Sequence, residues 1–162
     1  MMFSKPMGRS AGLLFLSLLV FAQCKKETIS KEEKVSMIIN HKWMLTNVSF
    51  QVHSEKNSID VLRAYYNDCE LDDSYIFYQS GEFNRRDSTH RCIESKRFGP
   101  YGYGYGYWSV DEEVGKITIN SVNKHNLEVV SLTPSSMELR ESMVDRELRY
   151  VSYTYKFRAI LY

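Results

Sequence analysis

The sequence predicts an all-β fold, an antiparallel meander of about eight strands that closes into a small barrel, with a short N-terminal helix after a signal peptide. Short segments that alternate apolar and polar residues follow one another, and no long helical pattern separates them. Aromatic residues reach 14%, with 12 Tyr and 8 Phe, and these residue types favour strands. Closure into a barrel removes the free edges of such a meander. The alternating segments are 43–53, 74–78, 82–86, 107–110, 116–120, 127–132, 137–143 and 151–158.

Residues 1–23 have the features of an export signal. Lys5 and Arg9 supply positive charge, and residues 11–22 form an apolar stretch. Twelve helical residues span about 18 Å, well short of the ~30 Å hydrocarbon core of a membrane. The segment therefore suits a cleaved signal better than a permanent membrane span.

Cys24 follows this apolar stretch directly, after Phe21, Ala22 and Gln23. The arrangement resembles the lipobox of bacterial lipoproteins, in which such a cysteine receives lipid and becomes the mature N-terminus. We therefore expect a lipid-anchored protein of the bacterial cell envelope, most simply at the outer membrane. The alternative is cleavage after Ala22 by an ordinary signal peptidase, which would leave a soluble periplasmic protein.

The cysteine count favours lipidation. The chain has three cysteines, and an odd number in an exported protein leaves a free thiol. If Cys24 carries lipid, Cys69 and Cys92 remain as one pair, which an oxidising compartment would close into a disulfide. The alternative is two unpaired, buried cysteines.

Residues 24–36 predict a charged tether, and residues 37–162 a single domain. Seven of the ten residues in 25–34 are charged. Ser30 and Glu33 have capping-box spacing, and Val35, Ile38 and Ile39 follow at helical intervals. This pattern predicts a short helix over about 31–39 that rests on the domain, with a frayed coil as the alternative.

The first strands of the meander are marked by aromatic residues and a turn. Residues 43–53 form one extended run, which begins at Trp43. Residues 74–78 and 82–86 flank the turn-forming sequence Gln79-Ser80-Gly81, a hairpin signal.

In the later strands, the alternation of apolar and polar residues predicts which face points into the barrel. Ile117 and Ile119 share one face of the segment 116–120, and Met137, Leu139 and Met143 share one side of 137–143. In the last segment the apolar and aromatic residues alternate with polar ones. The members of this apolar set are Val151, Tyr153, Tyr155 and Phe157.

In this order, these motifs resemble the lipocalin-like domain of exported bacterial lipoproteins. The shared features are a Trp that opens the first strand, the paired cysteines, the aromatic hairpin, the mid-chain Trp108 strand and the late Leu132-Thr133…Met137-Glu138-Leu139 hairpin. The resemblance covers about residues 40–158 and implies a lipocalin-like β-barrel. The chain has His41-Lys42-Trp43 where lipocalins usually have Gly-x-Trp.

Motifs for catalysis or cofactor binding are missing, so we expect no enzyme and no cofactor. The sequence contains no Gly-x-Ser-x-Gly, no His-Glu-x-x-His and no Walker loop. The four histidines are dispersed, and the closest metal-capable group, His90, Cys92 and Glu94, loses a ligand if Cys92 is oxidised; we therefore expect no metal. The formal net charge of +1 also gives no reason to expect nucleic-acid binding.

A tyrosine–glycine repeat is the most unusual segment. In an extended conformation, Tyr101, Tyr103, Tyr105 and Tyr107 line one face and the intervening glycines line the other. A row of phenols suits flat apolar or sugar ligands, so we take these tyrosines and Trp108 as candidate ligand contacts at the barrel rim. The alternative is a low-complexity loop, with Trp108 as a core residue.

Two functions remain open at this stage. The first is a lipid-anchored lipocalin-like module that binds a small apolar or amphiphilic ligand in its barrel mouth. The second is a structural or protein-interaction module whose barrel is filled by its own side chains, such as Phe77, Tyr153 and Phe157. A sizeable pocket near residues 93–107 would favour the first function.

Overall fold

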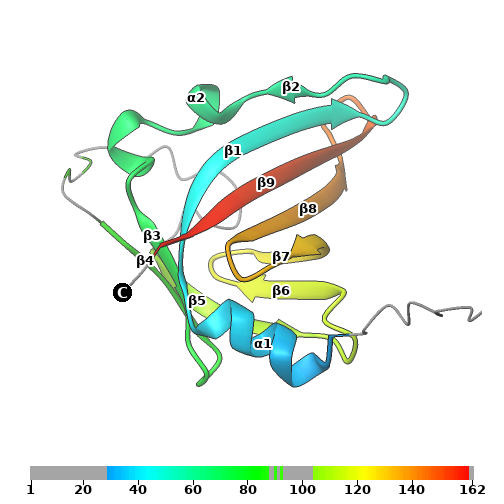
Figure 1. Cartoon of the computed structure of the whole chain (residues 1–162). Helices are drawn as coiled ribbons and strands as arrows, with labels where there is room; N and C mark the ends of the chain where they lie inside the picture. Colours follow the sequence, from blue (N-terminus) through cyan, green and yellow to red (C-terminus); the bar gives the residue numbers. More distant parts are fainter. Residues whose placement is uncertain (1–28, 88–89, 91, 93–103, 161–162) are drawn as a thin grey trace, which may run out of the picture.

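A closed antiparallel barrel forms the body of the protein (Figure 1). The structure is a computed structural model that describes residues 29–87, 90, 92 and 104–160. The barrel strands are β1 (Lys42–Val52), β3 (Ser74–Phe77), β4 (Glu82–Arg86), β5 (Tyr105–Val110), β6 (Lys116–Asn120), β7 (Lys124–Leu132), β8 (Ser136–Val144) and β9 (Tyr150–Ile160). Each strand pairs with the next, and β1 pairs with β9 to close the barrel. The predicted fold class is confirmed.

The connection between β1 and β3 contains the remaining small elements. These are β2 (Ile59–Asp60), α2 (Leu62–Tyr65) and the 3₁₀ turn η1 (Asp68–Glu70). β2 pairs with Ser49 and Phe50 of β1 and adds a two-residue ribbon outside the closed barrel. None of these three elements was predicted from the sequence. We call the end of the barrel at which β1 ends the mouth. These three elements follow β1 in the chain and lie at that end.

The opposite end is covered by α1 (Lys31–Ile39), as Figure 1 shows. The Ser30 side chain accepts a hydrogen bond from the Glu33 backbone N–H at 3.1 Å and caps the helix. Ile38 is fully buried, and the Trp43 indole N–H donates to its carbonyl at 2.9 Å. The predicted short N-terminal helix is therefore confirmed, and its first residues fall within the segment 24–36 assigned to the tether.

The corner between α1 and β1 explains why a glycine is not needed before Trp43. His41 stands at the position of that glycine, and among the described non-glycine residues only Val114 and Leu148 have a positive φ, so His41 has a backbone conformation open to any residue. The His41 ring Nδ1 donates to the Met37 carbonyl at 2.8 Å and so satisfies a carbonyl at the helix end. Glycine is required instead at Gly81 in the β3–β4 turn, where φ is +88°.

The interior is filled by one row of side chains above another. The strand pairing places Leu45, Phe157 and Met137 side by side, and then Val48, Tyr155 and Leu139. All six are at most 3% exposed. Fully buried aromatic residues of β1, β3 and β4 complete this core, namely Trp43, Tyr75, Phe77 and Phe83. The closed half of the barrel is therefore packed with its own side chains.

Candidate functional site

The inward side chains of the barrel are less completely buried in the rows nearest the mouth. The next row after Val48 and Tyr155 joins Phe50, Tyr153 and Glu141. Phe50 and Tyr153 are half-buried, although they occupy inward register positions like the fully buried residues below them. In the last row Met143 is 39% exposed, whereas its neighbours Val52 and Val151 are buried, so the opening lies on the β8 side. The barrel is thus filled below and partly open at its mouth.

A carboxylate and an imidazole lie together at this level. Glu141 is 7% exposed, and its Oε1 is 2.6 Å from His125 Nδ1. Its other oxygen accepts a hydrogen bond from the Tyr155 hydroxyl at 3.4 Å. The Glu141 contact favours the tautomer with the proton on Nδ1 and leaves the Nε2 lone pair as an acceptor. This Nε2 atom is buried and has no hydrogen-bond partner among the described residues.

A group of aromatic rings begins at Tyr153, which lies directly opposite Glu141 on β9. The Tyr153 ring lies 5.2 Å from that of Phe50 and 6.0 Å, edge-to-face, from that of Tyr65 in α2. Burial, followed by a hydrogen bond with Tyr65, raises the pKa of Tyr153 to about 12, so its hydroxyl stays protonated at neutral pH. We call the group Phe50, Tyr65, His125, Glu141 and Tyr153 the mouth cluster.

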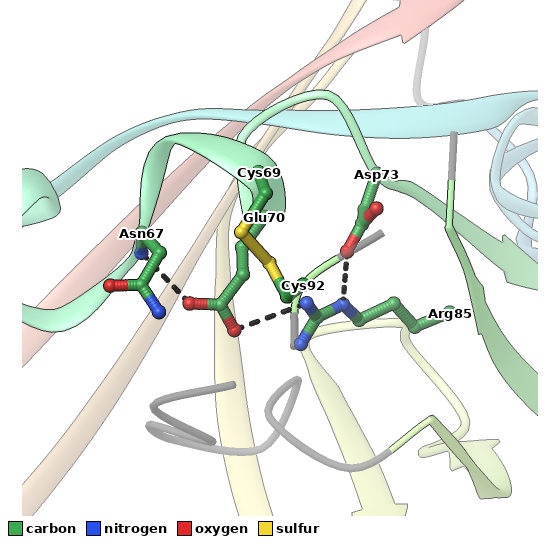
Figure 2. A network of polar contacts seen from close by, with 6 residues as sticks. All are labelled: Asn67, Cys69, Glu70, Asp73, Arg85 and Cys92. Carbon is green, nitrogen blue, oxygen red and sulfur yellow. Dashed lines mark hydrogen bonds and ion pairs between the residues drawn. A yellow bond between two sulfur atoms is a disulfide. The ribbon is translucent and has the colours of Figure 1, made fainter. Parts of the chain in front are cut away.

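A second polar group, the Arg85 network, ties η1 to the barrel wall (Figure 2). The Arg85 guanidinium donates from Nε to Asp73 at 2.6 Å and from Nη2 to Glu70 at 3.1 Å. The other Glu70 oxygen accepts from the Asn67 backbone N–H at 2.8 Å. Beside this network, a disulfide joins Cys69 of η1 to Cys92, with the Cα atoms 5.4 Å apart (Figure 2).

Electrostatics link the two polar groups. Burial lowers the pKa of Arg85, but Tyr75, Asp73 and Glu70 outweigh that effect and raise it overall, so the guanidinium stays charged. Burial raises the pKa of Tyr66 well above its usual value, with contributions from Tyr75 and both glutamates, Glu70 and Glu141. The buried Tyr66 phenol therefore lies within electrostatic reach of both groups.

The candidate residues from the sequence fall in separate places. Cys69 and Cys92 are joined by the disulfide, whereas Cys24, Tyr101 and Tyr103 lie outside the described residues. Tyr105 and Tyr107 are 79% and 65% exposed on the outer face of β5. Trp108 is 8% exposed and points the other way, with its indole N–H donating to the Tyr78 carbonyl at 2.9 Å. The structure does not bring Trp108 and the two tyrosines to one side of the wall.

Sequence reasoning missed the buried charges, although alternation carried a signal for two of them. Arg85 stands two residues after the buried Phe83, and Glu141 two residues after the buried Leu139. Both positions therefore belong to the inner faces of their strands. Glu70 and Tyr66 lie in the β1–β3 connection, where no periodicity marks an inner face.

The described residues hold neither a metal-ligand cluster nor a membrane-spanning helix. No three of their His, Cys, Asp or Glu side chains gather in a metal-binding arrangement. The nearest sequence candidate, His90, instead pairs with Asp72 at 3.2 Å. No helix in the described part of the chain has the length and apolarity needed to cross a membrane.

No family model matches the chain, and no curated protein does. Among solved structures, the chain is similar to odorant-binding protein from bovine nasal mucosa, with 13% identity, 79% of this chain and 74% of that chain covered, and a TM-score of 0.44. A complex of bovine odorant-binding protein with undecanal gives 12% identity, 75% and 70% coverage and a TM-score of 0.42. Membership of the bacterial lipoprotein family therefore stays a prediction.

Proposed function

We propose that the chain is an exported, lipid-anchored binding protein whose barrel mouth takes a small amphiphilic molecule without transforming it. The observation that carries this proposal is the mouth cluster. Half-buried Phe50 and Tyr153 share a row with Glu141, the partner of His125, and His125 Nε2 is a buried atom that has no hydrogen-bond partner among the described residues. An orphaned buried acceptor costs free energy, which a ligand donor at this position would recover.

The chemistry of the cluster defines the ligand class. His125 Nε2 accepts a hydrogen bond, so the polar end of the ligand carries a hydroxyl or an amine. Phe50, Tyr65 and Tyr153 offer ring faces and edges to its apolar part. Because side chains fill the barrel below Tyr155, the ligand is small and lies close to the rim.

Native mass spectrometry of the mature domain, purified from the cell envelope, tests this proposal. We expect a non-covalent small molecule to remain bound to the wild type. His125→Leu removes the acceptor and should weaken binding of that molecule about fivefold to tenfold, the value of one hydrogen bond. His53→Leu is the matched control, because His53 is exposed at the same end of the barrel. Equal retention in both variants would argue against a site at His125.

Lipid anchoring at Cys24 is the second part of the proposal. The apolar stretch before Cys24 supports it, as does the disulfide, which uses the other two of the three cysteines. Cys24→Ala should move the protein from the membrane fraction to the soluble fraction and abolish labelling with radioactive palmitate. A soluble wild-type protein that begins at Gln23 would contradict the anchor and leave the mouth site unaffected.

The alternative function is a structural or protein-interaction module with a filled barrel. The complete packing of the closed half favours it, because Trp43, Tyr75 and Tyr155 are each fully buried there. This alternative predicts no co-purifying molecule and no probe binding. The two functions make different predictions only for ligand binding at the mouth, so substitutions of mouth residues distinguish them.

A further inference from the structure

The outer wall of the barrel carries a second site, separate from the mouth. A groove of about 230 Å³ lies over β4 and β5 and is lined by Tyr78, Glu82, Asn84, Tyr105 and Tyr107, among others. The strand register places Asn84 opposite Tyr105 and Glu82 opposite Tyr107. Residues directly opposite one another share a face, so two phenols and two side chains with acceptor oxygens form one compact outward patch.

We propose that this groove, which we call the outer groove, binds a pyranose ring of a glycan. Its volume lies below the roughly 300–1,000 Å³ of pockets for drug-sized ligands, so it suits a single ring. Side chains two residues apart on a strand stand about 7 Å apart. A single ring in the groove can therefore reach the side chains of both Tyr105 and Tyr107.

Gly106, between the two tyrosines, lets β5 and β6 approach closely. A Cβ atom at this position would lie 2.5 Å from the Asn120 carbonyl oxygen of β6, so no side chain fits there. Residue 106 faces away from the two tyrosines, so only backbone lies between their side chains on the outer face. Tyr105 and Tyr107 remain 79% and 65% exposed, so their ring faces are available to a ligand.

The polar groups of the outer groove select a sugar over a purely apolar ring. The Glu82 carboxylate accepts from the Ser80 hydroxyl at 3.1 Å and has further acceptor capacity. The Arg86 guanidinium donates to the Tyr78 hydroxyl at 3.0 Å and fixes that phenol at the groove edge. An apolar ring would cover the carboxylate without replacing its water. A pyranose presents C–H faces to the tyrosines and hydroxyls to Glu82 and Asn84.

Titration calorimetry with cello-, chito-, malto- and laminarihexaose tests this proposal. At least one of the four hexaoses should bind the wild type, and the double variant Tyr105→Ser/Tyr107→Ser should weaken that binding at least tenfold. Tyr150→Ser is the matched control, because Tyr150 is also an exposed strand tyrosine, at 68%, but lies on β9. Asn84→Ala, which keeps both rings, should weaken binding less than the double variant.

Three results would overturn the inference. The first is that none of the four hexaoses binds the wild type. The second is binding that the double variant leaves unchanged. The third is self-association of the wild type, measured by sedimentation velocity, that the double variant abolishes, because the groove would then join two copies of the chain. None of these results bears on the mouth cluster, which lies inside the barrel.

Discussion

Arg85 and Asp73 form an ion pair inside the protein, with 2.6 Å between Arg85 Nε and Asp73 Oδ2 and side-chain exposures of 6% and 1%. The same guanidinium pairs with Glu70, whose side chain is fully buried. One cation therefore compensates two buried carboxylates. A buried charge without a partner is far more costly than a buried pair, so the barrel depends on Arg85.

Arg85→Met should lower the free energy of unfolding by about 3–5 kcal/mol, because it leaves Glu70 and Asp73 buried without their cation. Urea unfolding followed by tryptophan fluorescence measures this change. Arg140→Met is the matched control, because Arg140 pairs with Glu128 at the surface at 3.6 Å. We expect at most about 1 kcal/mol for that variant. Equal losses in the free energy of unfolding for the two variants would contradict the claim that burial makes the Arg85 ion pairs more important than a surface ion pair.

Removal of the disulfide should cost about 3 kcal/mol. Cys69 and Cys92 are 23 residues apart, and closing a loop of that length restricts the unfolded chain by about this amount. The double variant Cys69→Ser/Cys92→Ser should therefore unfold at a lower urea concentration, with a somewhat steeper slope because its unfolded chain is more expanded. Non-reducing peptide mapping of the exported wild type provides the control. Free thiols at both positions would contradict the account.

High pH should destabilise the protein. Burial raises the pKa of Tyr66 and of Tyr75 far above their ordinary value of 10.0. Above pH 10 the unfolded state loses these phenol protons while the folded state keeps them. Stability is therefore fully present below pH 10 and falls as the pH rises further, by about 1.4 kcal/mol per pH unit for each buried phenol.

Urea unfolding between pH 8 and 11.5 measures this loss, and phenolate absorbance follows ionisation. Tyr75→Phe should make the dependence on pH shallower, since it removes one buried phenol. Tyr107→Phe should leave it unchanged, because Tyr107 is exposed. If all tyrosines of the folded protein ionised near pH 10, the buried phenols would not be protected as the structure indicates.

Alternation predicted the strands because each strand of a barrel has one inner and one outer face. Ile117 and Ile119 are both fully buried, as that pattern requires. The predicted limits of β4 and β6 are correct, but two strands begin earlier than predicted: β5 begins at Tyr105 rather than Tyr107, and β7 begins at Lys124 rather than Leu127. The missed residues of β7 are polar and those of β5 belong to the tyrosine–glycine repeat, so neither set shows apolar–polar alternation, and hydrogen bonding to the neighbouring strand maintains both ends.

The inner face of β1 and the mouth cluster could not be predicted from alternation, because strand pairing is irregular in β1 and a charged residue is buried in the cluster. Between Leu45 and Asn47 the register of β1 shifts, so the inner face passes from odd to even residue numbers. The mouth cluster draws on α2 and on β1, β7, β8 and β9, and only the closed barrel brings these elements together. A polar residue such as Glu141 at an inner position reads as an interruption of the pattern until its partner His125 is found on β7.

The most direct test of the account is a titration with N-phenyl-1-naphthylamine, an apolar probe that carries one N–H donor. Met143→Trp places a large ring at the inner lip of the mouth, whereas Val144→Trp, at the next residue of β8, places the same ring on the outer face. We expect the wild type and Val144→Trp to enhance probe fluorescence equally, and Met143→Trp to lower the affinity at least tenfold. Absence of binding to the wild type, or equal binding by all three proteins, would contradict a ligand site in the barrel mouth.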